Sequence, residues 1–302
     1  MPENWNAVRV PASSANLGPG FDALGLALDV YLKCRFRPAS ELSIRVSGRD
    51  ASQIPVGADN FIWQTAEDVA TNAGLVMPPV EMSIENDIPL GKGLGSSAAA
   101  LVAGVVMASE VLGLGFDRSR VLQEAAAREG HPDNVAACVL GSIVASAVDH
   151  LHNARAVRME LHSTYNVAVI VPDLVLPTVE SRRVLPDTYT KADAIFNIQR
   201  STLLIAALSS GATSAFPLAL EDRMHQPYRC PLVPGLREIV SLRAPGLLGC
   251  ALSGAGPSIL VFHERGHEEV CYLVRRVFLE HGYQSETVCR SISSDGYRVG
   301  DY

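Results

Sequence analysis

Apolar and polar residues recur along the first half of the chain in patterns that predict short strands and capped helices. Alternating or continuous apolar runs favour strands, whereas apolar faces bounded by capping residues favour helices. Strands are expected at residues 8–10, 27–36, 42–46, 80–84 and 142–148, and helices at 60–73, 98–112 and 118–129. Asp59 or Asn60 would cap the first helix, and Asp117 and Gly130 would bound the third.

The second half repeats the alternation of strands and helices. Strands are expected at residues 165–171, 248–252, 258–262 and 287–291, with helices at 192–209, ended by Gly211, and at 267–282. The last helix has apolar residues on one face, which is typical of a helix packed on a sheet. The pattern predicts an α+β protein in two domains, residues 1–155 and 156–302, divided in a polar region near residues 150–163.

Composition narrows the class of protein. The chain has 302 residues, 48% of them hydrophobic and 19% charged, so it can bury a sizeable core. Its net charge is −7 and no block of Lys or Arg occurs, which argues against nucleic acid or a membrane as a partner. Neither a signal sequence nor a membrane span is visible, and the six cysteines show no metal-binding spacing. We therefore expect a cytoplasmic enzyme with buried free thiols.

Residues 89–99 form the most informative segment of the chain. They read Pro-Leu-Gly-Lys-Gly-Leu-Gly-Ser-Ser-Ala-Ala and lead into the expected helix at 98–112. A glycine loop before a helix N-terminus can bind phosphate through free N–H groups and the positive end of the helix dipole. The same loop could be purely structural. Its spacing fits neither a Walker A loop nor a dinucleotide fingerprint.

Polar residues elsewhere offer a second set of candidate ligands. Asn16 and Asp22 lie in the loop at residues 11–22 and could bind a polar substrate, or could cap their own turn. His131 and Asn134 follow a helix end and could bind ligand or cap the turn. Glu124 could reach a Mg²⁺ bound to phosphates, or could lie on a solvated helix face.

Arginine and glycine residues in the second half complete the candidate chemistry. Arg182, four residues after Thr178, and Arg229 could each hold a carboxylate or phosphate, or could form surface ion pairs. The turn at residues 253–257 could pack against the first glycine loop or be only a tight turn. The spacings of common hydrolase and zinc-protease motifs do not occur.

Taken in order, these segments resemble the motifs of the GHMP kinases. Residues 11–22 look like the first family motif, residues 89–99 match the phosphate-binding motif, and residues 252–258 match the third. Residues 129–136 are similar to a segment found in the branch of the family that phosphorylates homoserine. The matches extend over residues 8 to 262, nearly the whole chain.

The resemblance implies a fold, a reaction and a set of site residues. The fold is an N-terminal domain like domain 2 of ribosomal protein S5, which binds ATP, and a C-terminal ferredoxin-like domain. The reaction transfers phosphate from ATP to L-homoserine, with Mg²⁺, on the route to threonine. Substrate would be bound by Asn16, Asp22, His131, Asn134, Arg182 and Arg229; ATP by Asn60 and by Pro89, Leu90, Gly91, Lys92, Gly93, Leu94, Gly95, Ser96, Ser97, Ala98 and Ala99; and metal by Ser97 and Glu124. Asn134, Thr178 and Arg182 are the candidate catalytic residues.

Several alternatives stay open at this point. Glu129 is a second candidate for the metal ligand, because the spacing from Glu124 to His131 is one residue shorter than the family pattern suggests. The resemblance implies no strong general base. Mevalonate, a sugar or shikimate could replace homoserine as substrate, or the chain could be a non-catalytic ligand sensor. The oligomeric state is also open, with a homodimer as one candidate.

Overall fold

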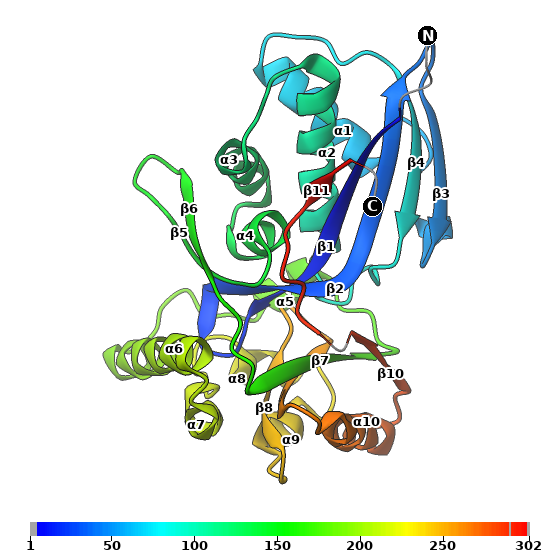
Figure 1. The fold of residues 1–302 in the computed structure, drawn as a ribbon. Coiled ribbons are helices and arrows are strands. Elements are labelled where there is room, and N and C mark those ends of the chain that lie inside the picture. The colour runs from blue at the N-terminus through cyan, green and yellow to red at the C-terminus, as the bar shows by residue number, and fades with distance from the viewer. Residues whose placement is uncertain (1–4, 290, 301–302) are drawn as a thin grey trace.

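Two β-sheets with helices packed against them form the computed structural model, which describes residues 5–289 and 291–300 (Figure 1). The larger sheet has the order β11-β1-β2-β4-β3, with β5 paired to β2 and β6 to β5. Only β3 and β4 pair in parallel among its described strands. The strands are β1 (Asn6–Asn16), β2 (Gly20–Pro38), β3 (Ser43–Gly48), β4 (Val80–Asn86), β5 (Ile143–Val148), β6 (Ala154–Met159) and β11 (Arg298–Val299).

Four helices and a 3-10 turn accompany the larger sheet. They are η1 (Ala51–Gln53), α1 (Phe61–Asn72), α2 (Ser96–Leu112), α3 (Arg118–Glu129) and α4 (Asp133–Leu140). In α2, every residue from Ala98 to Ser109 is buried, because the helix lies between β1, α1, α3 and α4. This helix therefore anchors the glycine loop that precedes it.

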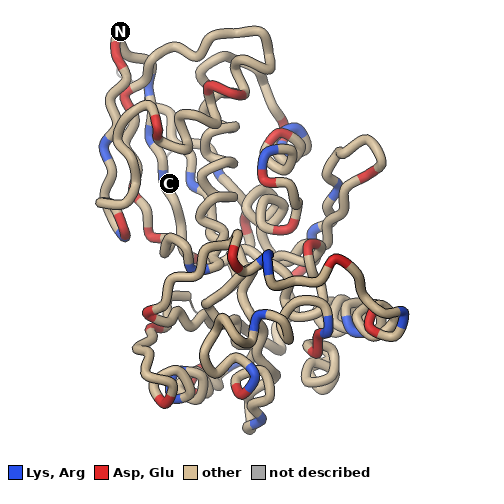
Figure 2. The backbone as a smooth tube through the Cα atoms, turned by 180° about the vertical axis from the view of Figure 1, so that it is seen from behind, with Lys and Arg blue, Asp and Glu red and all other residues tan. Residues whose placement is uncertain are grey.

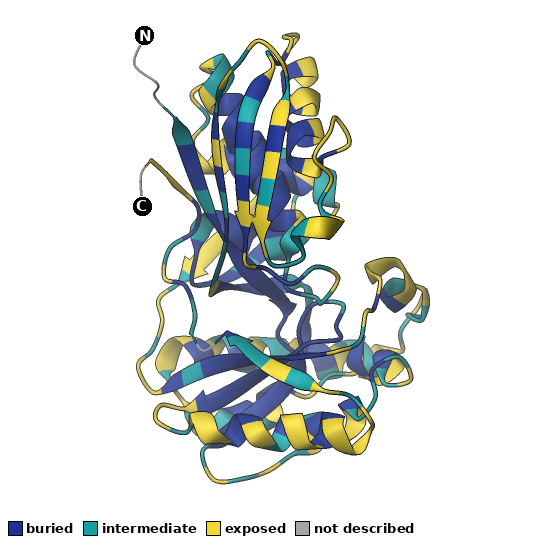
Figure 3. Cartoon of the chain, turned by 90° about the vertical axis from the view of Figure 1, so that its right-hand side faces the viewer, coloured by how far each residue is buried: buried dark blue, intermediate teal, exposed yellow. Residues whose placement is uncertain are grey.

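The smaller sheet lies below the first in Figure 1 and is antiparallel, with the order β10-β7-β9-β8. Its strands are β7 (Tyr165–Pro172), β8 (Leu247–Leu252), β9 (Ile259–Glu264) and β10 (Ser285–Cys289). The accompanying elements are α5 (Thr178–Arg183), α6 (Lys191–Ser210), η2 (Thr213–Ala215), α7 (Phe216–Ala219), α8 (Gln226–Arg229), α9 (Leu236–Ser241), η3 (Glu268–Val270) and α10 (Cys271–Glu280). The apolar face of α10 is buried against this sheet and its other face is exposed (Figure 3).

Most predicted elements are confirmed within a few residues, but the loop expected after residue 13 is mostly strand. β1 and β2 pair as far as Asn16 and Gly20, so the turn between them is only three residues long. Ser13 and Ser14 are fully buried, and their hydroxyls are hydrogen-bonded to Asn134 and Ser253. Polar residues can occupy a buried strand when their hydroxyls are hydrogen-bonded. Because these residues lack the apolar pattern of a buried strand, the sequence predicts a loop here instead.

The expected boundary between residues 155 and 156 falls inside β6, which pairs with β5 of the first sheet. The chain enters the second sheet only at β7, and it returns at the end. β11 pairs with β1, and Ser293 N donates a hydrogen bond to Ala27 O. The first sheet thus includes residues from both ends of the described chain.

Charged residues are spread over both halves of the molecule, and those in the described part of the chain form no continuous stripe of Lys and Arg (Figure 2). Within residues 5–289 and 291–300, no helix combines the length and apolar character that crossing a membrane requires. None of the six cysteines forms a disulfide within the described residues; five of them are buried and Cys230 is half-buried.

Candidate active site

A cavity between the two halves of the molecule gathers most of the predicted site residues. Six segments contribute: the β1–β2 turn, the glycine loop, the α3–α4 corner, helix α5, helix α8, and the turn before β9. The lining residues are Ala15, Asn16, Phe21, Asp22, Gly91, Gly93, Leu94, Gly95, Ser96, Ser97, Glu129, His131, Asp133, Asn134, Thr178, Arg182, Arg229, Gly254 and Ala255.

The glycine loop is held in place by the second glycine turn. Ser253 Oγ donates a hydrogen bond of 2.7 Å to Gly93 O, and a Cβ on Gly93 would lie 2.3 Å from Ser253 O. Gly95 has φ +66°, and a Cβ there would lie 2.0 Å from Ser13 Oγ. Only glycine fits positions with both restraints. The turn at residues 253–257 therefore packs against the phosphate-loop candidate, which resolves one of the alternatives left by the sequence.

The N-terminus of α2 forms one wall of the cavity. Gly95 precedes the helix without providing a side-chain cap, and Ser96 and Ser97 line the cavity in the first turn. First-turn N–H groups have no acceptor within their own helix, so this end of α2 can bind an anion. The 17-residue length of α2 places the full helix dipole behind it.

Several residues of the glycine segment do not face this cavity. Lys92 Nζ donates hydrogen bonds to Pro172 O and Leu174 O, at 3.0 and 2.8 Å, and so fastens the loop to the end of β7. Pro89 and Leu90 line a neighbouring cleft. Ala98 and Ala99 are fully buried in α2.

Asn60 acts as the N-cap of α1. Its Oδ1 accepts hydrogen bonds from Ile62 N and Trp63 N, and its Nδ2 donates to Pro55 O. The side chain is 1% exposed. Its Oδ1 is thus used in capping and its Nδ2 is bonded to the preceding loop, and the cavity lining does not include Asn60.

The two candidate metal carboxylates lie in different environments. Ser97 Oγ donates a hydrogen bond of 3.1 Å to Glu129 Oε2, and both residues line the cavity. Glu124 instead forms ion pairs with Arg120 at 2.6 Å and Arg128 at 2.8 Å, outside the lining. Glu124 therefore lies outside this cavity and between two arginines, whereas Glu129 lies beside Ser97. Burial raises the pKa of Glu129, despite opposing effects of His131 and Ser97.

Asn16 and Asp22 lie at the two sides of the β1–β2 turn with left-handed backbones, φ +72° and +53°. Asn16 Oδ1 accepts a hydrogen bond of 3.0 Å from Asp22 N, while Asn16 Nδ2 donates to Gly254 O at 3.0 Å. Asn and Asp tolerate this conformation better than most residues. The turn therefore projects the Asp22 carboxylate into the cavity.

Arg182 and Arg229 face the same cavity from α5 and α8, with Thr178 at the start of α5. Arg182 donates two hydrogen bonds to the Asp22 carboxylate, at 2.8 and 3.2 Å. Arg229 is 1% exposed and donates from Nε to Ser181 O and from Nη1 to Gly254 O. No carboxylate of the described residues forms an ion pair with it. Burial, with the charge of Arg182, lowers the pKa of Arg229 to about 10, so the group stays charged at neutral pH.

His131, Asp133 and Asn134 form a hydrogen-bonded group at the α3–α4 corner. His131 Nδ1 lies 2.8 Å from Asp133 Oδ1, which also accepts from Asn134 N. Burial opposes protonation of His131, but its hydrogen bond to Asp133 raises the pKa above the ordinary value. Ser13 Oγ donates to Asn134 Oδ1, so the amide presents its NH₂ group to the cavity.

The carboxylates of a second possible metal cluster are already paired with neighbouring side chains. Ligand atoms of Asp22, His131 and Asp133 lie within 4.8 Å of one another. Asp22 is paired with Arg182, however, and Asp133 with His131. Ser97 and Glu129 are the better donor set for Mg²⁺, which prefers one or two carboxylates together with phosphate oxygens and water.

Some lining residues were not singled out from the sequence. Phe21 lies beside Asp22, and its ring centroid is within 6 Å of the guanidinium carbons of both Arg182 and Arg229. Asp133 and Ala255 lie in the segments at residues 129–136 and 253–257 that the sequence indicates, but neither is predicted from the sequence to bind ligand. No sequence spacing identifies a single apolar residue in a turn as a site residue. Such a residue is recognised only from the contacts that the folded chain makes.

Comparisons with known proteins agree along nearly the whole chain. Residues 60–142 match the family described as GHMP kinases N terminal domain. A homoserine kinase from Solibacter usitatus is 62% identical over 98% of this chain and 97% of its own length. A homoserine kinase from Deinococcus radiodurans is 44% identical over 85% of this chain and 84% of its own.

Solved structures extend the comparison to the fold. The crystal structure of homoserine kinase from Cytophaga hutchinsonii has a TM-score of 0.86 at 26% identity, covering 99% of this chain and 98% of that one. The galactokinase of Lactococcus lactis has a TM-score of 0.67 at 14% identity, covering 98% and 95%. The second similarity concerns the fold alone.

Proposed function

The chain belongs to the homoserine kinases of the GHMP kinase superfamily, and we propose that the cavity described above carries out this family's reaction. ATP and L-homoserine are converted to ADP and O-phospho-L-homoserine. The homoserine hydroxyl oxygen forms a bond to the γ-phosphorus of ATP as the bond to the β-phosphate oxygen breaks. We further propose that this occurs in the cytoplasm, where ATP is the common phosphate donor.

The arrangement of Asp22, Arg182 and Arg229 is the observation that supports an amino-acid substrate in this part of the cavity. A carboxylate and two guanidinium groups facing one cavity suit a zwitterionic amino acid. The ammonium group of the substrate pairs with Asp22, and its carboxylate pairs with Arg229 and Arg182. The substrate ammonium then takes the place of Arg182 beside Asp22, and the substrate carboxylate takes the place of Asp22 beside Arg182. Asn16 and His131 complete the polar lining around it.

The glycine loop and α2 bind the triphosphate in this proposal. N–H groups from Gly91 to Ser97 surround the phosphates, and the dipole of α2 favours their negative charge. Lys92 anchors the loop to the end of β7 and does not contact the phosphates. Phosphoryl transfer depends mainly on positioning and charge neutralisation, so such a loop can supply much of the catalysis.

Ser97 and Glu129 would hold Mg²⁺ together with phosphate oxygens. The donor set fits, because a hydroxyl and a half-buried carboxylate lie 3.1 Å apart beside the anion site. The bound ion would neutralise charge on the phosphates. Glu129 must be ionised to contribute, and ion binding favours that form.

No residue is assigned as a strong general base. The Asn134 amide presents NH₂, which cannot accept a proton, and Asp133 is engaged by His131 and by Asn134 N. We propose that the hydroxyl proton passes to a phosphate oxygen or to solvent. Asn134 and Thr178 then serve to orient the hydroxyl, and Arg182 neutralises charge near the transferred group.

A coupled ADP-release assay with four alcohols tests the substrate. Homoserine should give turnover, whereas mevalonate, shikimate and galactose, which lack the amino-acid zwitterion, should give none above background. Turnover with another of these alcohols in preference to homoserine would contradict the assignment. Background ADP release with all four would instead favour a ligand sensor built on the same fold.

A further inference from the structure

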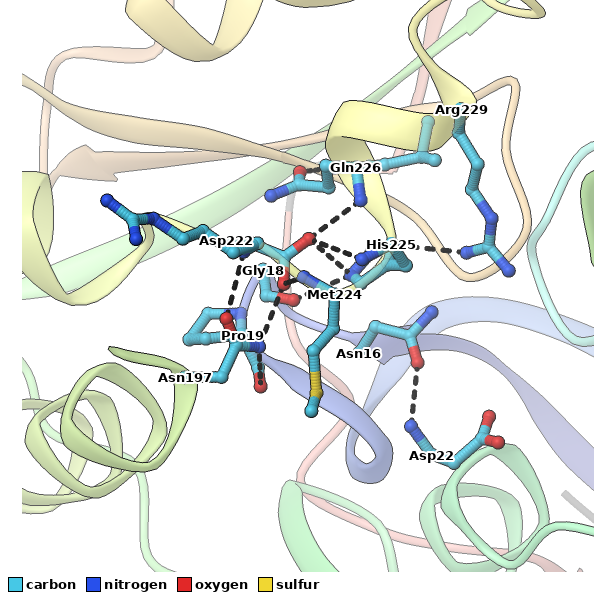
Figure 4. Close-up of polar contacts among 12 residues, drawn as sticks. Asn16, Gly18, Pro19, Asp22, Asn197, Asp222, Met224, His225, Gln226 and Arg229 are labelled. Atoms are coloured by element: carbon cyan, nitrogen blue, oxygen red, sulfur yellow. Dashed lines mark hydrogen bonds and ion pairs between the residues drawn. The ribbon is translucent and has the colours of Figure 1, made fainter. Parts of the chain in front are cut away.

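Arg229 is held by a buried polar network that the proposed mechanism does not use. Figure 4 shows this network, in which residues of the segment 222–229 lie against the turn that joins β1 to β2. His225 lies at its centre and is fully buried. Its Nε2 is 2.7 Å from Gly18 O, and its Nδ1 is 3.1 Å from Arg229 Nη1.

The two neighbours of His225 determine which ring nitrogen carries the proton. Gly18 O can only accept a hydrogen bond, so Nε2 must be the donor. Arg229 Nη1 can only donate, so Nδ1 must be the acceptor. Both contacts are satisfied by the neutral ring with its hydrogen on Nε2, and protonation of Nδ1 would remove the acceptor and place a second positive charge beside the guanidinium.

The charged groups around His225 agree with a neutral ring. Burial lowers the pKa of His225, and the nearby charge of Arg229 lowers it further, while Asp222, Asp22 and the Gly18 carbonyl act in the opposite direction. The net effect is a pKa below the ordinary value.

Asp222 fixes the segment that carries His225. Its Oδ2 accepts hydrogen bonds from His225 N at 3.0 Å and Gln226 N at 2.7 Å. Its Oδ1 accepts from Met224 N and from Asn197 Nδ2, both at 2.8 Å. Burial would raise the pKa of Asp222, but the hydrogen bonds that its carboxylate accepts lower that pKa below the ordinary value, so the carboxylate stays ionised.

A second contact ties the same network to the β1–β2 turn. Asn197 of α6 also donates from Nδ2 to Pro19 O, at 3.2 Å. The ring of Phe21 stacks on His225 with centroids 5.3 Å apart. Residues from the turn that carries Asp22 and the segment that carries Arg229 are therefore joined through His225.

We propose that Asp222 and His225 form a positioning pair for Arg229, in which neutral His225 accepts a hydrogen bond from the guanidinium and holds it where it meets the substrate carboxylate. This inference rests on the proposed role of Arg229 in binding homoserine. His225 touches no reacting group, so its effect is exerted through Arg229. The pair fixes one side of the guanidinium and leaves Nη2 for the ligand, since Nη2 donates no hydrogen bond to the described residues.

Two substitutions separate the two contacts of His225. The Oδ1 of an asparagine comes near the position of Nδ1, so His225→Asn keeps an acceptor for Arg229. The amide of a glutamine comes near the position of Nε2, so His225→Gln keeps a donor for Gly18 O but loses that acceptor. The measurements are KM for homoserine, KM for ATP, kcat and thermal unfolding of each folded variant.

We expect His225→Gln to raise KM for homoserine about tenfold, corresponding to loss of one charge-assisted hydrogen bond, with KM for ATP unchanged. His225→Asn should recover most of the affinity. In an Arg229→Ala background, His225→Gln should have little further effect, because coupled residues give non-additive changes.

Equal KM values for the two His225 variants, additive effects in the double variant, or parallel changes in both substrates' KM values would each overturn the positioning role. If His225→Gln fails to fold, the comparison of His225→Asn with the unmodified protein still decides, since a KM for homoserine raised as far as in Arg229→Ala contradicts the proposal. Lack of homoserine turnover by the unmodified protein would instead count against the proposed function.

Discussion

Arg182 donates two hydrogen bonds to Asp22, at 2.8 and 3.2 Å, across the cavity between the two halves of the molecule. The two residues are 160 positions apart in the chain. Both side chains are more than one-third exposed, so water screens their attraction and a charged ligand can compete for either partner. This pair therefore joins the two halves without closing the cavity to substrate.

Replacement of Asp22 by Asn should weaken homoserine binding more than it slows turnover. The variant keeps the shape of the side chain but removes the charge that pairs with the substrate ammonium. A charge-assisted hydrogen bond contributes about 1.5–3 kcal/mol, so KM for homoserine should rise about 10- to 100-fold. The coupled ADP-release assay measures this, with the exposed helix variant Asp68→Asn as control. An unchanged KM in Asp22→Asn would exclude this role.

Glu129→Gln and Glu124→Gln form a matched pair for the metal site. Glu129→Gln removes the carboxylate beside Ser97, so kcat should fall about 100-fold and activity should require more Mg²⁺. Glu124→Gln removes two helical ion pairs of about 0.3–0.5 kcal/mol each and should leave the dependence on Mg²⁺ unchanged. Mg²⁺ titrations of initial rate distinguish the two. The reverse ranking of the variants would restore Glu124 as the ligand.

Gly95→Ala should impair ATP binding because its Cβ meets Ser13 Oγ. Gly113 has a similar left-handed backbone, φ +64°, but nothing lies within 4 Å of its Cβ position. Gly113→Ala therefore costs only the left-handed strain of about 1–2 kcal/mol, while Gly95→Ala adds a collision in the phosphate loop. We expect KM for ATP to rise at least tenfold only in Gly95→Ala. Thermal unfolding of both variants controls for general destabilisation, and an equal KM for ATP in the two would rule out the loop's role.

The pKa of Glu129 predicts opposite effects of acid on activity and stability. Its pKa is raised above 4.5, mainly by burial. As pH falls through this raised value, the carboxylate is protonated and Mg²⁺ binding weakens, so activity at low Mg²⁺ declines. The folded state binds the proton more readily than the unfolded chain, so the contribution of Glu129 to stability increases as pH falls through the same range.

Measurements of the reaction rate and of unfolding between pH 4.5 and neutrality test the predicted loss of activity and gain of stability in acid. The acid limb of activity should move to lower pH as Mg²⁺ rises, because metal and proton compete for the carboxylate. Glu129→Gln should lose the limb and the associated change in stability. A limb of unchanged position in that variant would show that another group titrates.

The sequence allowed the local features to be predicted well and the long-range ones less well. Asp117 and Gly130 bound α3 as expected, because a cap and a left-handed glycine act within a few residues. The place of β6 and β11 in the first sheet depends on pairing between distant segments, which no local pattern encodes. His225 likewise has no local signal in the sequence, because its contact with Gly18 joins segments 207 positions apart.

The charged residues around Glu124 and Glu129 in the sequence already distinguish these two candidate metal ligands. Arg120 and Arg128 flank Glu124 at four residues on either side, which is the spacing of helical ion pairs. Glu129 has no arginine four residues before it and lies at the helix end, where the chain turns toward His131. The spacing therefore contained a signal for a paired surface residue, although the contact of Glu129 with Ser97 needed the fold.

The return of residues 291–299 to the first sheet affects how the protein can be divided. Tyr297 N donates to Cys138 O, and Val299 pairs with Val8, so the last strand closes against the first. A fragment ending near residue 155 would lack both β11 and part of β6, and would leave edges of its sheet unpaired. A single proteolytic cut between β6 and β7 would, by contrast, leave two pieces that remain associated through this returning segment. The linker is thus a suitable place for a nick or a circular permutation, and an unsuitable place for a truncation.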